Sequence, residues 1–187
     1  MSRFTLLSEP LPGAKLLQRE ARGDSRGMLS RLFCAQELAA LGWEQCVAQI
    51  NLTCTSRCGT IRGLHFQYPP HNEKKLVTCI RGRVWDVIVD IRAGSPTFLT
   101  WHAEELSDSN FRSLVIPEGF AHGFQTLSDE VEMLYCHSAM YVPEAEGGLS
   151  PLDPRIQITW PLTIAELSAR DRQHPTLKDC FQGIVIR

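Results

Sequence analysis

The sequence predicts an all-β fold, a sandwich or barrel of short strands with a few short helices. Runs rich in β-branched and aromatic residues recur along the 187 residues, and such runs are typical of strands. Turn-forming clusters separate them, for example at residues 68–72 and 93–96. With 43% hydrophobic residues the chain can bury a sizeable core, and we expect residues 1–187 to form one domain.

The clearest strand spans residues 84–92. Its side chains alternate between two sets, Trp85, Val87, Val89 and Ile91 against Asp86, Ile88 and Asp90. This period of two predicts a central strand with one apolar face. Further strands are expected at residues 49–53, 60–67, 75–80, 113–116 and 131–137. Short strands at this spacing indicate a sandwich or a barrel.

Two segments carry helix signals. Residues 34–41 form the first, which stops at Gly42. Residues 163–173 form the second, because its start has the spacing of a capping box and Pro175 follows its end. This helix would place Asp171 near its C-terminus, where the helix dipole disfavours a carboxylate. The tail, residues 177–187, is expected to be ordered or to form a short edge strand.

Charge and apolar patterning exclude several classes of function. The formal net charge of -2 provides no field that would attract nucleic acid or an anionic membrane. The N-terminal residues lack a long apolar stretch, and charged residues or proline interrupt every apolar run before it could span a bilayer. We therefore expect a cytoplasmic protein that has neither nucleic acid nor membrane as a partner.

The cysteines fit a reducing compartment. Seven of them are scattered along the chain, and an odd, irregular set does not match the disulfide framework of a small secreted fold. Cys54 and Cys58 have a CxxxC spacing, but no second pair of cysteines or histidines lies near them in the sequence to complete a tetrahedral zinc site. The sequence therefore predicts free thiols and no metal at this pair.

The candidate chemistry centres on His65. It lies between Arg62 and Lys75 in residues 59–75, GTIRGLHFQYPPHNEKK, and a histidine between two cations suits an anionic carbonyl substrate. In an extended strand Ile61, Gly63 and His65 share one face, so the imidazole could point into a barrel mouth as a base. A hydrogen-bonded core histidine without a chemical role is the alternative that this pattern leaves open.

Three motifs together resemble one enzyme family. Residues 59–75, residues 116–124 (IPEGFAHGF) and residues 167–171 (LSARD) occur in the order found in the dTDP-4-dehydrorhamnose 3,5-epimerase family. The resemblance extends over about residues 24–175. It implies a cupin-like jelly roll, a homodimer, and epimerisation at C3, C5 or both of a nucleotide-linked 4-keto-6-deoxy hexose without a cofactor.

The resemblance also implies the catalytic roles. The histidine of the RGLHFQ motif removes a proton next to the C4 ketone, which makes His65 the base. Asp171 matches the aspartate of the LSxKD segment, and a base of this kind needs a carboxylate to hold its tautomer and stabilise the imidazolium. Lys75 matches the lysine that stabilises the enolate oxygen. Because a Pro-Pro turn separates them, we expect Lys75 and His65 on adjacent antiparallel strands.

Inversion also needs an acid on the opposite face of the sugar, because return of the proton from His65 would restore the starting configuration. Tyr135, in the segment EMLYCHSAMY, matches the acid proposed in the family. It shares a strand face with Val131 and Met133, so a buried structural tyrosine is the alternative.

The expected substrate-binding residues also follow from the resemblance. Arginine binds phosphate through two nitrogens and stays charged, and Arg26 and Arg62 hold the matching positions, although each could be a plain surface charge. The other residues expected to contact the base, the sugar or their surroundings are Gln49, Asn51, Gln67, His122 and Tyr141.

Some positions expected beside the nucleotide and sugar depart from the family pattern. Residues 49–53 are QINLT where the family commonly has QDNHS. Arg31 stands where the family has a glutamate, and residues 151–153 are PLD where it has WND. The sequence therefore leaves open the nucleotide, the sugar and the centre that is inverted.

Two other classes of function are possible from the sequence. A metal-dependent cupin such as a dioxygenase typically needs a His-x-His pair, whereas Phe66 and Gln67 follow His65. A noncatalytic sugar-nucleotide-binding cupin would not need the complete set of base, partner carboxylate, enolate donor and acid. The chain also lacks a glycine-rich dinucleotide fingerprint, so we expect an enzyme with no metal and no organic cofactor.

Overall fold

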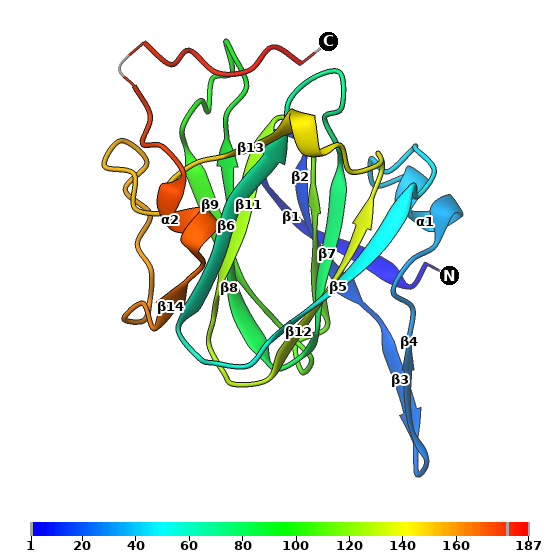
Figure 1. Ribbon diagram of the computed structural model, residues 1–187. Coiled ribbons are helices and arrows are strands. Elements are labelled where there is room, and N and C mark those ends of the chain that lie inside the picture. Colours follow the sequence, from blue (N-terminus) through cyan, green and yellow to red (C-terminus); the bar gives the residue numbers. More distant parts are fainter. Residues whose placement is uncertain (1, 179, 187) are drawn as a thin grey trace.

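Two β-sheets face each other across the core of the molecule (Figure 1). The computed structural model describes residues 2–178 and 180–186. The first sheet has the antiparallel order β1 (Phe4–Leu11), β2 (Ala14–Arg19), β10 (Arg112–Ile116), β7 (Lys75–Arg81), β12 (Val131–His137) and β5 (Gln49–Thr55). The second has the order β13 (Glu146–Gly148), β6 (Thr60–Gln67), β11 (Phe120–Thr126), β8 (Arg83–Asp90) and β9 (Trp101–Ser107). This architecture confirms the all-β prediction.

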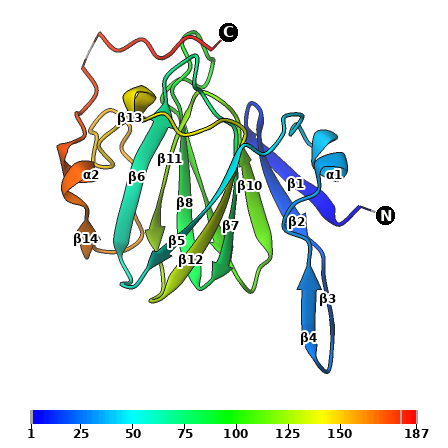
Figure 2. The same ribbon diagram turned by 45° about the vertical axis from the view of Figure 1, so that its right-hand side comes forward.

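A hairpin of β3 (Ala21–Asp24) and β4 (Gly27–Ser30) projects away from both sheets (Figure 2). Arg26 lies at its tip. Two large apolar side chains on β4 are exposed to solvent, Met28 to 60% and Leu29 to 73%. The hairpin therefore presents apolar surface that the described part of this chain does not cover.

Apolar residues bury both faces of β8. Ile88 packs in the core between the sheets together with Leu114. Val87 and Val89 pack on the other side of the second sheet, in a cluster that the C-terminal segment covers through Ile184. The prediction of a central strand is confirmed, since β8 pairs with β11 and β9. The prediction of a single apolar face is wrong, because this C-terminal covering buries the second face.

The other predicted strands are confirmed, and some strands lacked a clear signal. β6 and β12 span the predicted residues, and β5, β7 and β10 extend beyond the predictions by one or two residues. The sequence did not indicate β1, β2, β9 or β11. In β11 the glycine and histidine of FAHGFQT interrupt the pattern, and β9 (WHAEELS) contains alanine and glutamate, which are depleted in strands.

The second predicted helix, residues 163–173, is wrong in its first half. Glu166–Leu167 form the short strand β14, which pairs in parallel with the start of β6, and only α2 (Ala169–Gln173) is helical. Ser168 caps α2, because its hydroxyl accepts a hydrogen bond from the backbone N–H of Asp171 at 3.0 Å. Asp171 therefore lies in the first turn, where the helix dipole favours a carboxylate, and the expected capping box does not form.

The first predicted helix is short, since α1 (Ala35–Ala39) occupies only the middle of residues 34–41. The tail contributes one isolated parallel bridge, between Arg92 and Ile184, in place of a strand. Residues 179 and 187 of the predicted tail lie outside the described residues. No helix in the described part of the chain is long and apolar enough to cross a membrane.

Candidate active site

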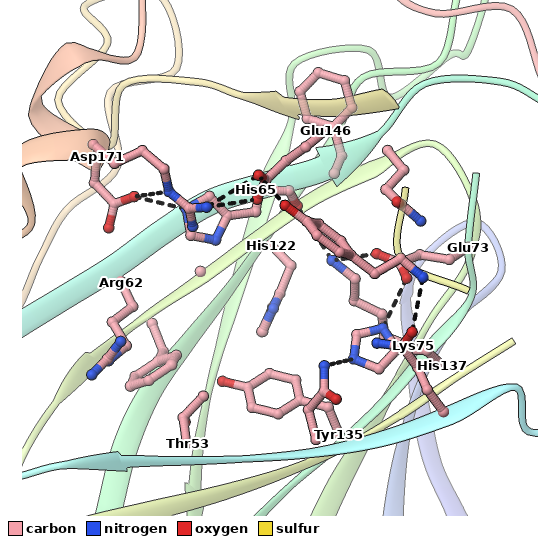
Figure 3. Close-up of a pocket in the computed structure, with 18 of the residues that line it drawn as sticks. Thr53, Arg62, His65, Glu73, Lys75, His122, Tyr135, His137, Glu146 and Asp171 are labelled. Atoms are coloured by element: carbon pink, nitrogen blue, oxygen red, sulfur yellow. Dashed lines mark hydrogen bonds and ion pairs between the residues drawn. The ribbon is translucent and has the colours of Figure 1, made fainter. Parts of the chain in front are cut away.

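A cavity of ≈ 860 Å³ is lined by strands of both sheets (Figure 3). Its volume is in the range of small-molecule sites. The predicted site residues that line it are His65, Asp171, Lys75, Tyr135, Gln49, Asn51, Arg62, Gln67, His122 and Tyr141. The fold thus brings together nearly all of the side chains that the sequence motifs proposed.

His65 and Asp171 form a short hydrogen bond in this cavity. His65 Nε2 lies 2.7 Å from Asp171 Oδ1, and the N–H of Gly63 donates to the other carboxylate oxygen at 3.3 Å. Burial alone would raise the pKa of Asp171, but the hydrogen bonds from His65 and Gly63 outweigh it and hold the pKa below its usual value. An ionised carboxylate only accepts, so Nε2 carries the proton and Nδ1 is the nitrogen left to act as a base.

A bulge in β6 turns His65 into the cavity. The register between β6 and β11 shifts between the pairs His65–His122 and Arg62–Phe124. His65 consequently lines the cavity with Arg62, and the prediction that it shares a face with Ile61 is wrong. Gly63 permits the bulge, because it has a φ of +122° and a Cβ there would lie 2.6 Å from the backbone of β11.

Lys75 reaches His65 from the opposite sheet. The prediction of adjacent antiparallel strands is wrong, because β7 pairs with β10 and β12 whereas β6 pairs with β11 and β13. Lys75 Nζ nevertheless lies 3.5 Å from the carbonyl oxygen of His65 across the cavity. Lys74 points the other way, and its ammonium donates to the carbonyl of Gly42 at 2.6 Å. Lys75, and not Lys74, is therefore the lysine of this cavity.

Tyr135 lies on the wall opposite His65, on β12 of the first sheet (Figure 3). It is 8% exposed and stands edge-on to His122, with ring centroids 6.0 Å apart. Burial raises the pKa of Tyr135, so the phenol keeps its proton and can serve as an acid. Val131 and Met133 belong to the same core cluster, as expected from the shared strand face.

Most of the chain resembles known epimerases. A sequence model of the dTDP-4-dehydrorhamnose 3,5-epimerase family matches residues 8–179. A dTDP-4-dehydrorhamnose 3,5-epimerase from Streptomyces griseus is 43% identical over 169 residues, which cover 89% of this chain and 84% of that protein. The chain belongs to this family.

Two further relatives illustrate the range of the epimerase family. A dTDP-4-dehydrorhamnose 3-epimerase from Streptomyces niveus is 42% identical, with 82% of this chain and 74% of that protein covered. A dTDP-6-deoxy-D-glucose-3,5-epimerase from Legionella pneumophila, solved in complex with dTDP-4-keto-L-rhamnose, is 35% identical with a TM-score of 0.91, covering 98% of this chain and 99% of that one. The expected jelly roll and the expected class of enzyme, a carbohydrate epimerase, are thereby confirmed.

Glu73 and His137 are ionisable residues of the epimerase cavity that the motifs did not single out. Glu73 accepts from Lys75 Nζ at 3.1 Å and from His137 Nδ1 at 2.8 Å. Burial would raise the pKa of Glu73, but the hydrogen bond from His137 and the charge of Lys75 outweigh it and lower the pKa. A period of two could have indicated both, since Glu73 lies two residues before Lys75 and His137 two after Tyr135.

His122, which lines the epimerase cavity, forms a further buried histidine–carboxylate pair. His122 Nε2 is 2.9 Å from Asp86 Oδ2, and their side chains are 5% and 0% exposed. The other oxygen of Asp86 has no hydrogen-bond partner within the described residues. The sequence proposed His122 for the site, but it placed Asp86 only in the polar set of a strand.

Gln67 lines the cavity but is engaged by the protein itself. Its side-chain amide donates to the carbonyls of His71 at 2.9 Å and Met140 at 3.2 Å, and its oxygen accepts from the N–H of Val142 at 2.7 Å. These bonds hold the loop that carries Tyr141. The geometry therefore favours a supporting role for Gln67 over the predicted substrate contact.

Arg26 does not line the cavity of its own chain. Its side chain is 87% exposed at the hairpin tip, where it forms an ion pair with Asp24 at 2.7 Å. The structure therefore does not bring this predicted phosphate ligand to the other site residues of the chain.

The departures from the family pattern lie mostly outside the epimerase cavity. On β5, Gln49, Asn51 and Thr53 face the cavity, whereas Ile50 and Leu52 are exposed to 60% and 53% on the opposite face. Arg31 forms an ion pair with Glu37, and the segment 151–153 does not line the cavity either. Of these departures, the threonine at position 53 is the one that lines the cavity within the described residues.

A third titratable group lies beside the His65–Asp171 pair. One ligand atom each of His65, Asp171 and His174 lies within 4.8 Å of the other two. This is the group of side chains in the described residues that could hold a metal ion, and the sequence did not indicate it because His174 follows the LSARD motif.

Proposed function

We propose that this epimerase inverts C3 of a dTDP-linked 4-keto-6-deoxy hexose, and that it also acts at C5 of a suitable substrate. The observation that carries the proposal is the placement of His65 and Tyr135 on opposite walls of one cavity, which Lys75 also lines. Relatives named as 3,5-epimerases and as a 3-epimerase share C3 as the inverted centre. Their names also support dTDP as the nucleotide.

The reaction begins at His65. Its Nδ1 accepts the proton next to the C4 ketone, and the electron pair moves onto the ketone oxygen as an enolate. Asp171 stabilises the imidazolium that forms. Lys75 donates to the enolate oxygen, and the bond between Lys75 and Glu73, 3.1 Å long, orients its ammonium.

Tyr135 completes the inversion. Its phenol donates a proton to the opposite face of the same carbon, which restores the ketone with inverted configuration. Arg62, Gln49, Asn51, His122 and Tyr141 bind the nucleotide and the sugar around this centre. A location in a reducing compartment such as the cytoplasm is supported by the seven free thiols.

Solvent deuterium identifies the substrate and the centre. In deuterated water the enzyme should incorporate deuterium at C3 of a dTDP-linked 4-keto-6-deoxy hexose and form the inverted product, because the acid and the base exchange their protons with solvent. Matched CDP- and GDP-linked sugars are the controls, and NMR maps the label at C3 and C5. A lack of label in every sugar would identify the chain as a noncatalytic sugar-nucleotide-binding protein.

Removal of metal ions by a chelator distinguishes the proposed cofactor-free reaction from that of a metal-dependent cupin. Exhaustive EDTA treatment should not lower turnover, because every proposed proton transfer uses protein side chains alone. Turnover after dialysis against chelator-free buffer is the reference. A loss of activity that one divalent ion restores would assign the chain to the metal-dependent class.

The position of Arg26 supports a homodimer. If Arg26 binds substrate phosphate, it must reach the cavity of a second copy, and the exposed Met28 and Leu29 on its hairpin give such a copy apolar surface to bury. Sedimentation should therefore give twice the chain mass of 21.1 kDa. Arg26→Ala should raise KM by about tenfold or more, whereas Arg22→Ala on the same hairpin should not. A fully active monomer would contradict this assignment.

A further inference from the structure

His174 is a partly buried histidine that the proposed reaction does not use. Its Nε2 lies 3.5 Å from Asp171 Oδ1, and its side chain is 14% exposed. Its ring stands edge-on to that of His65, with centroids 5.5 Å apart. This Nε2 is buried and has no hydrogen-bond partner within the described residues. A buried ring nitrogen close to the shared carboxylate therefore lacks the hydrogen bond that buried polar atoms normally have.

We propose that His65, Asp171 and His174 form a binding site for a divalent transition-metal ion such as Zn²⁺, and that the bound ion inhibits the enzyme. Two imidazoles and one carboxylate are the donor set of many three-ligand zinc sites, in which a fourth position stays open. The inhibitory consequence rests on the proposed function of His65, whereas the binding site itself does not.

The spacing of the three groups suits such an ion. Tetrahedral bonds of about 2.1 Å place ligand atoms about 3.4 Å apart. The distance of 3.5 Å between His174 and Asp171 already matches this value. The bond of 2.7 Å between His65 and Asp171 must open by about 0.7 Å, which a rotation of either side chain provides.

The bound ion would disable the base through its tautomer. Without metal, His65 carries its proton on Nε2 and presents a free Nδ1 to the substrate. A metal ion on Nε2 displaces that proton, and the neutral ring then carries its proton on Nδ1, so its proton count is unchanged. A protonated Nδ1 cannot accept the substrate proton. The ion sits on the side of the ring that faces Asp171, so substrate binding is retained.

Arg170 is the group with which the ion competes. Its Nη2 lies 3.3 Å from His65 Nε2, and its guanidinium also pairs with Glu146 at 3.1 Å. The Arg170 side chain is 57% exposed, so it can move into solvent when a cation binds. Removal of this positive charge should tighten the site.

Zinc binding is measured first without substrate, by titration of Zn²⁺ alone into metal-free enzyme with a chromophoric chelator as competitor. His174→Gln should weaken binding by at least about 100-fold, since loss of even an outer-shell partner costs 10- to 100-fold. Arg170→Gln should tighten it by about tenfold. His71→Gln, at an exposed histidine that does not line the cavity, is the matched control and should bind zinc as the wild type does.

Turnover is then measured with and without zinc. Zinc should lower kcat of the wild type at least tenfold with little change in KM, and His174→Gln should keep its turnover under the same zinc concentration. Equal zinc affinity in the wild type and His174→Gln would overturn the site, as would inhibition that acts on KM alone. If the proposed epimerase function is wrong, the wild type shows no turnover even without zinc, whereas the titration still reports the site.

Discussion

His65→Ala and Asp171→Asn should each lower turnover by about 10³-fold or more, because each removes one half of a single proton-transfer unit. Their hydrogen bond is 2.7 Å long, and Asp171 is held ionised by its hydrogen bonds despite burial. The double variant should be little slower than His65→Ala alone, since Asp171 acts through His65 and losses within one unit do not add. NMR of product formation at saturating substrate gives the three rates.

A matched pair outside the cavity controls for general effects of such substitutions. His102 and Glu104 also form a histidine–carboxylate pair, with a distance of 3.8 Å, on β9. His102→Ala should leave turnover within a few fold of the wild type. Fully additive losses in the His65 and Asp171 variants would show that the two residues act separately.

Tyr135→Phe should separate hydrogen exchange from inversion. The variant keeps the aromatic ring and its packing against His122, and it leaves the base His65 in place. Only the hydroxyl group is removed. Deuterium should still enter the substrate through His65, whereas inverted product should fall by at least about 100-fold. The ratio of the two rates, followed by NMR in deuterated water, reports the role of the hydroxyl.

The ratio also separates Tyr135 as an acid from the other roles that a buried tyrosine can have. A purely structural tyrosine would lower exchange and inversion together, and a tyrosine that only binds substrate would raise KM and leave both rates intact at saturation. If Tyr135→Phe inverts the sugar at the wild-type rate, another group donates the proton. An ordered water molecule would be the first candidate to test.

The sequence predicted those features that local patterns encode. Local strand signals between turn-forming clusters located β6 and β12 at their observed bounds, and the motifs around His65 and Asp171 proposed a pair that the fold brings to 2.7 Å. Such patterns depend on a few neighbouring residues. They can be recognised without knowledge of the rest of the fold, because strands in most β proteins bury their apolar side chains in the same way.

Features that depend on distant partners could not be predicted in this way. The bulge at Gly63 depends on the close approach of β11, and the position of Lys75 depends on which sheet β7 joins. Residues 163–167 have helix signals, yet Glu166 and Leu167 pair with the start of β6, where β13 leaves its edge free. Long-range pairing overrode local propensity in each of these places.

The attachment of Asp171 makes catalysis more fragile than the fold. Asp171 belongs to a short peripheral segment, β14 and α2, whose links to the barrel are the pairing of two residues with β6, the bonds of Asp171 and the partly exposed ion pair of Arg170 with Glu146. Segments with so few attachments open locally at a lower free energy than paired central strands. Opening of this segment would withdraw the carboxylate from His65 while both sheets stay intact. Heat or denaturant should therefore inactivate the enzyme before the barrel unfolds, and removal of the stress should restore activity without refolding of the sheets.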